Sequence, residues 1–224
     1  MSSLQFSPMT AKEFALFWPT FQAIVAAQET YAIDPHISQE EAFALWCQTP
    51  RLSMAVKDEQ GALLGSYYLK ANAAGPGQHV CNCGYMVTPQ ARGKGVASAM
   101  CEHSQQEAVT QGFKAMQFNA VVASNHVAVG LWQRLGFEIV GTVPNAYQHA
   151  SLGYVDTHVM YKALTPHYPS ASTLTAPHRP TVIQRCKRQH RRARVSVVFI
   201  LSRDHTQIAH KRYSLPDLET LTLT

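Results

Sequence analysis

The chain has 224 residues, of which 46% are hydrophobic, and this allows one globular domain with an extension. Five cysteines without disulfide spacing, and no apolar run near the roughly 20 residues of a membrane helix, argue against a disulfide-stapled or membrane-spanning protein. Because residues 1–5 carry neither a basic nor an apolar segment, we expect a protein of the reducing cytoplasm.

The net charge of +5 comes from one end of the chain. Residues 1–164 carry 9 Lys and Arg against 11 Asp and Glu, whereas residues 165–224 carry 10 against 3. Residues 165–180 are rich in Pro, Ser and Thr, and residues 185–194 form a basic block. We therefore predict a folded domain at 1–164 and a basic, disordered tail at 165–224.

In chain order, the sequence first predicts a strand at 4–8 and a helix at 10–27 that Pro19 would split or kink. Ser38 and Glu41 form a capping box that starts a helix at 39–48. The following expected elements are strands at 51–57 and 63–69 around a hairpin signal at 58–61, a loop at 72–78 and a strand at 79–87.

Helices and strands then alternate along the chain. A helix at 96–111 ends at Gly112 and precedes a strand at 115–122. Val127, Leu131 and Leu135 line one face of a second helix. A strand at 137–141, a loop at 144–153 and a last strand at 154–164 follow. This order predicts an α/β (α+β) protein.

The glycine-containing loop at 90–95 joins a predicted strand to a predicted helix. Helix N-termini present unpaired N–H groups with partial positive charge, and glycine lets the main chain approach an anion closely. The loop therefore predicts a diphosphate site. Gly95 follows Lys94, which breaks the P-loop pattern, and the absence of an acidic residue between Glu107 and Glu138 disfavours a dinucleotide fingerprint.

Gln90, Gly93 and Gly95 match the acetyl-CoA loop of the GCN5-related N-acetyltransferases (GNAT), Arg/Gln-x-x-Gly-x-Gly/Ala. The order of strand, loop, helix, strand, Asn125, helix, Leu-Gly-Phe and strand resembles the core of this superfamily over residues 4–164. The resemblance implies a GNAT fold, with a mixed, mostly antiparallel sheet that is flanked by helices and splayed at the acetyl-CoA loop.

The same resemblance implies acetyl-CoA as the cosubstrate. Main-chain groups of Met86 and Val87 would pair with its pantetheine arm, and Asn125 would contact it. The alternative role of Asn125 is to cap the second helix, and both roles can hold together. The pyrophosphate would lie against the loop and first helical turn, formed by Arg92, Gly93, Lys94, Gly95, Val96 and Ala97.

Residues 69–72, 79–87 and 117–119 also resemble the yeast-type acetyltransferases of L-azetidine-2-carboxylate and related proline analogues. In that family one asparagine acts in the reaction and another binds the substrate carboxylate. These positions correspond to Asn82, as a catalytic and substrate-binding residue, and to Asn119. The alternative for Asn82 is a buried amide that satisfies the backbone at a bulge, which Gly84 favours.

Trp132 stands where the superfamily often places a tyrosine as general acid. An indole N–H donates a hydrogen bond but delivers no proton, so we expect Trp132 to pack against the coenzyme or the core. His79, Glu29 and Tyr154 are the candidate general bases. His79, Cys81 and Cys83 alternate along one strand without a fourth ligand, so we expect no metal.

The sequence therefore predicts an enzyme, an acetyl-CoA-dependent N-acetyltransferase that acts on a small amino acid or analogue. A homodimer is an arrangement that the resemblance implies. The alternatives are a phosphinothricin-type or protein N-terminal acetyltransferase and, in another class, a non-catalytic acyl-CoA-binding protein or a tail-mediated nucleic-acid-binding protein. The basic block at 185–194 lacks interleaved aromatic residues, so we expect neither nucleic acid nor a membrane as partner.

Overall fold

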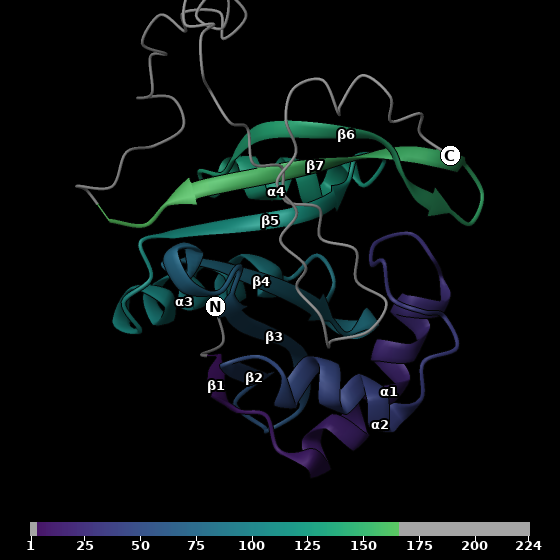
Figure 1. Ribbon diagram of the computed structural model, residues 1–224. Coiled ribbons are helices and arrows are strands. Elements are labelled where there is room, and N and C mark those ends of the chain that lie inside the picture. Colours follow the sequence, from purple (N-terminus) through teal and green to yellow (C-terminus); the bar gives the residue numbers. More distant parts are fainter. Residues whose placement is uncertain (1–3, 166–224) are drawn as a thin grey trace, which may run out of the picture. The chain divides into compact units, whose positions relative to one another are not determined.

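The computed structural model describes residues 4–165, which form a seven-stranded sheet with helices on both faces (Figure 1). The strand order is β1-β2-β3-β4-β5-β7-β6, and every neighbouring pair is antiparallel except β4 and β5. This confirms the mixed, mostly antiparallel sheet. The strands are β1 (Gln5–Pro8), β2 (Leu52–Lys57), β3 (Leu63–Ala71), β4 (Val80–Val87), β5 (Ala115–Val122), β6 (Glu138–His149) and β7 (Gly153–Ala163).

The helices are α1 (Ala11–Ala26), α2 (Gln39–Phe43), α3 (Val96–Thr110) and α4 (His126–Arg134), with a π-helical turn at Ala44–Gln48 after α2. The predicted capping box opens α2, since Ser38 Oγ accepts from the Glu41 N–H at 3.2 Å while Glu41 Oε2 accepts from the Ser38 N–H at 2.9 Å. The predicted split at Pro19 is wrong: α1 continues through this exposed proline. Buried Phe17 and Phe21 on either side anchor both turns in the core.

Two hydrophobic cores cover the two faces of the sheet. Residues of α3 and α4, among them Met100 and Trp132, pack with Tyr67 on one face. Phe14 and Phe21 of α1 and Trp46 of the π-helical turn pack with Tyr68 on the other. Since adjacent residues of β3 serve opposite cores, the strand alternates as a sheet buried on both sides requires.

The predicted loop at 144–153 is wrong for its first part, because β6 continues through Pro144 to His149. Proline removes one ladder donor, which an edge strand tolerates, and β6 is the edge of the sheet. The register shifts between Val143 and Tyr147, where Asn145 adopts a positive φ of 53° and its N–H donates to Asp156 Oδ1 at 2.9 Å. A bulged edge strand therefore replaces the expected loop.

The predicted disordered tail lies, from residue 166 on, outside the described residues, and so does Cys186. None of the helices within 4–165 has the length and apolar character to span a membrane.

Candidate active site

The loop between β4 and α3 places two glycines in the left-handed region directly before the helix. Gly93 has φ +74° and Gly95, the N-cap of α3, has φ +78°. A Cβ built on either glycine meets no heavy atom within 4 Å, so both main chains border open space. Gly95 has no side chain with which to cap the helix, so the amides of the first turn face outward without a capping oxygen. This geometry suits an anionic group.

β4 and β5 separate just beside this loop. Their parallel pairing is limited to Val80 with Ala115 and Cys81 with Met116, after which the strands diverge. Figure 1 shows β5, β7 and β6 parting from β4 and the strands beyond it. This confirms the expected splay. The expected bulge in β4 is wrong, however, because the β3–β4 register is unbroken from Gly65–Val87 to Ala71–Cys81.

Hydrogen-bond parity shows which main-chain groups of β4 face the opening. At the two ends of β4, the main-chain groups of even-numbered residues bond on the side of β3. The Thr88 N–H donates to Leu64 O at 2.8 Å, and Val80 O accepts from the Asn72 N–H at 2.9 Å. The odd-numbered His79 O instead accepts from Lys114, before β5, at 2.8 Å. Odd-numbered residues of β4 therefore turn their N–H and C=O groups toward β5 and the opening.

The two residues predicted to contact the pantetheine arm, Met86 and Val87, direct their main-chain groups to opposite sides of β4. Val87 directs its main-chain groups into the opening, as expected. Met86 directs its groups to β3, where it pairs with Ser66, and its side chain is buried against α1 and α2. An arm that adds to β4 like a strand would therefore use Val87 and Tyr85, in place of Met86.

Asn82 lies at the vertex of the splay. Its side chain is 7% exposed; Nδ2 donates to Gln117 O at 2.9 Å, and Oδ1 accepts from the Tyr68 hydroxyl at 3.0 Å. The amide thus ties β4 to β5 one residue beyond their last paired position. This is the structural role kept as an alternative, although without the expected bulge. The second N–H of Nδ2 is left for a substrate, so a part in the reaction stays a prediction.

Asn119 lies in the β5 bulge, where the register with β7 shifts between Phe118 and Val121. It is exposed, its Oδ1 accepts from Gln117 Nε2 at 2.9 Å, and its Nδ2 donates to Asn72 Oδ1 at 2.7 Å. Lys70, two residues before Asn72, holds its Nζ 5.4 Å from the centroid of the Tyr68 ring. A cation and three amides therefore gather near Asn82, and sequence reasoning missed Lys70 and Asn72 as part of this group.

Asn125 and Trp132 occupy the second helix. Asn125 Oδ1 accepts from the Ala128 N–H at 3.1 Å, so Asn125 caps α4, and its coenzyme contact stays a prediction. Trp132 is 9% exposed and lies with its ring centroid 5.1 Å from those of both Tyr85 and Phe118. The expected core packing of Trp132 is confirmed.

Tyr31, from the loop between α1 and α2, reaches the open edge of β4. Its hydroxyl donates to Tyr85 O at 2.7 Å and accepts from the Tyr85 N–H at 2.9 Å. Burial raises the pKa of Tyr31 well above its usual value, so the hydroxyl stays protonated. Sequence reasoning missed this residue because Tyr31 and Tyr85 lie 54 positions apart and no motif joins them.

The alternating residues His79, Cys81 and Cys83, at which no metal was expected, have other partners. Cys81 Sγ donates to Ala115 O at 3.3 Å, and Cys83 Sγ donates to Tyr68 O at 2.7 Å. Burial raises the pKa of the Cys81 thiol to about 12 and that of Cys83 well above its usual value. His79 Nδ1 lies 3.0 Å from Pro76 O. Within residues 4–165 no group of three His, Cys, Asp or Glu side chains could hold a metal ion.

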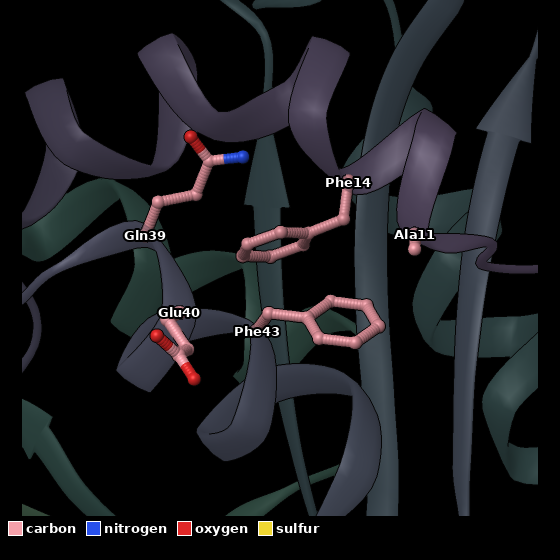
Figure 2. A pocket seen from close by; sticks show the side chains of 5 residues that line it. All are labelled: Ala11, Phe14, Gln39, Glu40 and Phe43. Carbon is pink, nitrogen blue, oxygen red and sulfur yellow. The ribbon is translucent and has the colours of Figure 1, made fainter.

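A separate open hollow of about 330 Å³ lies between the first turns of α1 and α2 (Figure 2). It is lined by Ala11, Phe14, Gln39, Glu40 and Phe43, and the rings of Phe14 and Phe43 lie 5.4 Å apart between centroids. None of these residues belongs to the glycine loop or to the splayed strands. We therefore place the candidate site at the splay and not in this hollow.

A family model and a curated relative both match this chain and point to the same family. The model of the Acetyltransferase (GNAT) family matches residues 14–137. N-acetyltransferase aca1 of Schizosaccharomyces pombe is 32% identical over 158 residues, which cover 63% of this chain and 74% of that protein.

Solved structures share the fold. A GCN5-related N-acetyltransferase from Kribbella flavida is 43% identical with a TM-score of 0.68, over 71% of this chain and 97% of that one. A phosphinothricin acetyltransferase of the GNAT superfamily from Sinorhizobium meliloti, in complex with acetyl-CoA, is 20% identical with a TM-score of 0.66, over 76% and 95%. The chain belongs to the acetyltransferase (GNAT) family, and it is an N-acetyltransferase of that type.

Proposed function

We propose that this enzyme transfers the acetyl group of acetyl-CoA to the amine of a small amino acid or analogue. The observation that carries the proposal is the uncapped N-terminus of α3, which opens beside the edge of β4 that has no strand partner after Cys81. A pyrophosphate and an amide-bearing arm in one molecule would fit these two features together. The acetyl-CoA complex of the Sinorhizobium meliloti relative supports this choice of donor.

The loop would bind the pyrophosphate through main-chain N–H groups of residues 93–97. Arg92 and Lys94 are exposed on either side of Gly93 and would add positive charge. The odd-numbered edge of β4 would then receive the pantetheine arm, with Val87 nearer the loop and Tyr85 further along. The thioester would thus lie within the splay, close to Asn82.

The group of Lys70, Asn72, Gln117 and Asn119 supports an acceptor that carries a carboxylate. Lys70 supplies a cation, and the amides supply N–H donors that could replace their present mutual bonds. A free amino acid has its amine one carbon from its carboxylate. Its binding at this group would direct the amine toward Asn82 and the thioester, which is the positioning that amide formation needs.

A calorimetric titration with acetyl-CoA, followed by a mass-spectrometric amine panel, tests the proposal. The panel contains free amino acids and cyclic analogues, phosphinothricin, and peptides with free N-termini. We expect saturable binding of acetyl-CoA and acetylation of a free amino acid or cyclic analogue. Acetylation of peptides alone would remove the small-molecule acceptor, and preference for phosphinothricin would select that alternative. No binding of acetyl-CoA would refute the proposed donor.

The Gly93→Asp variant tests the coenzyme loop directly. The substitution places a carboxylate at the anion site and a Cβ at a positive φ, so we expect acetyl-CoA affinity to fall at least 100-fold, about 2.7 kcal/mol. Gly61→Asp is the matched control, because Gly61 has φ +81° and equally open surroundings in the β2–β3 turn. Calorimetry on both variants separates backbone strain from the loss of the site. Equal affinities in the two variants would contradict the loop assignment.

A further inference from the structure

We propose that Tyr31 is a catalytic residue, whose hydroxyl donates a hydrogen bond to the thioester carbonyl oxygen beside the Tyr85 N–H. The inference deepens the proposed function and rests on it. It starts from the two hydrogen bonds that join the Tyr31 hydroxyl to a single residue on the open edge of β4, 2.7 Å from Tyr85 O and 2.9 Å from Tyr85 N.

These two bonds place the hydroxyl where an added strand would bond. Tyr85 is an odd-numbered residue of β4, so its N–H and C=O face the opening beyond the last β4–β5 pair. A carbonyl oxygen that accepts from the Tyr85 N–H must take the position now held by the Tyr31 oxygen. The hydroxyl then moves aside by about one hydrogen-bond length, roughly 2.8 Å, and can turn its proton from Tyr85 O to the incoming oxygen.

The surroundings hold Tyr31 near this position. Its ring packs edge-on against Trp46, with centroids 5.9 Å apart, and its carbonyl oxygen accepts from the Tyr147 hydroxyl at 3.3 Å. Gln28, three residues earlier, accepts from the Ala150 N–H at 3.2 Å. The loop that carries Tyr31 is thus fastened to the β6–β7 hairpin, and the tyrosine spans the splay from that hairpin to β4.

The two other tyrosine hydroxyls described at the splay bond elsewhere, and the Trp132 ring packs in the core. The Tyr85 hydroxyl lies 2.7 Å from Ser104 Oγ in the core beneath α3. The Tyr68 hydroxyl donates to Asn82, and Trp132 packs between Tyr85 and Phe118. Tyr31 is therefore the side-chain donor that, within residues 4–165, the structure places at the Tyr85 N–H.

The chemistry needs a donor that remains protonated. The amine attacks the thioester carbon, the C–N bond forms, and the π electron pair of the carbonyl moves onto its oxygen. The Tyr31 hydroxyl and the Tyr85 N–H stabilise that oxyanion without giving up their protons. When the C=O bond re-forms, the C–S bond breaks and its electron pair leaves with sulfur. Coenzyme A takes a proton from solvent, and the new amide nitrogen releases one to solvent.

The Tyr31→Phe variant removes the hydroxyl and keeps the ring that packs on Trp46. We expect kcat to fall about 10²- to 10³-fold, the effect of one lost oxyanion donor, while the Kd for acetyl-CoA stays within about threefold. Tyr67→Phe is the matched control, because its hydroxyl bonds His103 at 2.8 Å on the opposite face of the sheet. The control should keep its kcat. A kcat for Tyr31→Phe within about threefold of the parent enzyme would overturn the proposal.

Infrared spectroscopy of bound acetyl-CoA, carbon-13 labelled at the carbonyl, needs no acceptor amine. In the parent enzyme we expect the carbonyl band at lower frequency than in water, and a return toward the water value in Tyr31→Phe. Incorporating 3-fluorotyrosine at position 31 preserves the ring and makes the hydroxyl a stronger donor, so the band should move lower still. An unchanged band in the fluorinated protein overturns the role of Tyr31 even if Tyr31→Phe fails to fold. Absence of acetyl-CoA binding by the parent enzyme would instead refute the proposed function itself.

Discussion

Gly84 has no side chain, and the ring of Tyr68 occupies the space that one would need. An ideal Cβ on Gly84 would lie 2.5 Å from Tyr68 Cε1 and 3.0 Å from its Cζ. The same tyrosine holds Asn82 in place through its hydroxyl, at 3.0 Å. Gly84 was expected to favour a bulge, but it is a glycine because the Tyr68 ring leaves no room for a side chain.

We expect Gly84→Ala to destabilise the fold by about 1–3 kcal/mol, because the new methyl group must displace the Tyr68 ring from a packed core. The displaced ring should also lose its bond to Asn82, so turnover should fall as well. Urea unfolding and steady-state kinetics measure the two effects. Gly141→Ala serves as control, since a Cβ there meets nothing within 4 Å. Equal stability of the two variants would show that the Tyr68 ring does not determine the choice of glycine.

The site residues differ in how far the sequence could reveal them. Gly93 and Gly95 were found because a local motif, a turn and a helix start coincide within a few positions. Tyr31 was missed because its partner Tyr85 lies 54 positions away, and Lys70 was missed because only the pairing of β3 with β4 places it opposite Asn82. Met86 was assigned to the coenzyme together with Val87. The pairing of a strand decides which of its main-chain groups face which neighbour, and the sequence does not specify that pairing.

At the level of elements, Lys162 of β7 joins three parts of the fold. Its Nζ donates to Leu135 O at 2.6 Å, at the C-terminus of α4, and to Gln105 Oε1 of α3 at 2.5 Å. Nζ also lies 5.8 Å from the centroid of the Phe137 ring. A cation at this position satisfies a terminal carbonyl of α4 and complements the helix dipole.

Replacing Lys162 with Met keeps the aliphatic stem and removes both hydrogen bonds. We expect a loss of about 1–3 kcal/mol in the free energy of unfolding, because a part-buried carbonyl and amide oxygen lose their donor. Lys12→Met, at an exposed position of α1, is the control and should change stability by less than about 0.5 kcal/mol. Chemical denaturation decides, and a Lys162→Met variant as stable as its control contradicts the capping role.

The element predictions succeeded where the signals were local and failed where tertiary packing dominated. The capping box of α2 and the helix start at Gly95 depend on neighbouring residues, and the structure has both. The extension of β6 through Pro144 depends on pairing with β7 at the sheet edge, which a proline in the sequence conceals. The continuity of α1 at Pro19 likewise depends on the core beneath it.

At the level of the whole molecule, His103 lies where β1, β3 and α3 meet. Its ring stacks on Phe6 of β1 at a centroid distance of 3.9 Å, and its Nδ1 lies 2.8 Å from the Tyr67 hydroxyl of β3. His103 itself belongs to α3, so one side chain joins a helix to two strands. Burial lowers the pKa of His103, and the negative charge of Glu107 offsets only part of this effect.

This position predicts that the stability of the folded protein depends on pH. The folded state disfavours the imidazolium, so the unfolded state binds the proton more readily. The contribution of His103 is therefore fully present above the ordinary histidine pKa of about 6.5 and is lost as the pH falls through the lower folded value.

Melting temperatures measured from pH 7.5 to 5 should decrease. The decrease should be smaller in His103→Phe, which keeps a ring against Phe6 but cannot titrate. His36→Phe, at an exposed position, should retain the parent slope. If the melting temperature of His103→Phe falls with pH as steeply as that of the parent protein, another group causes the acid sensitivity and the prediction for His103 is wrong.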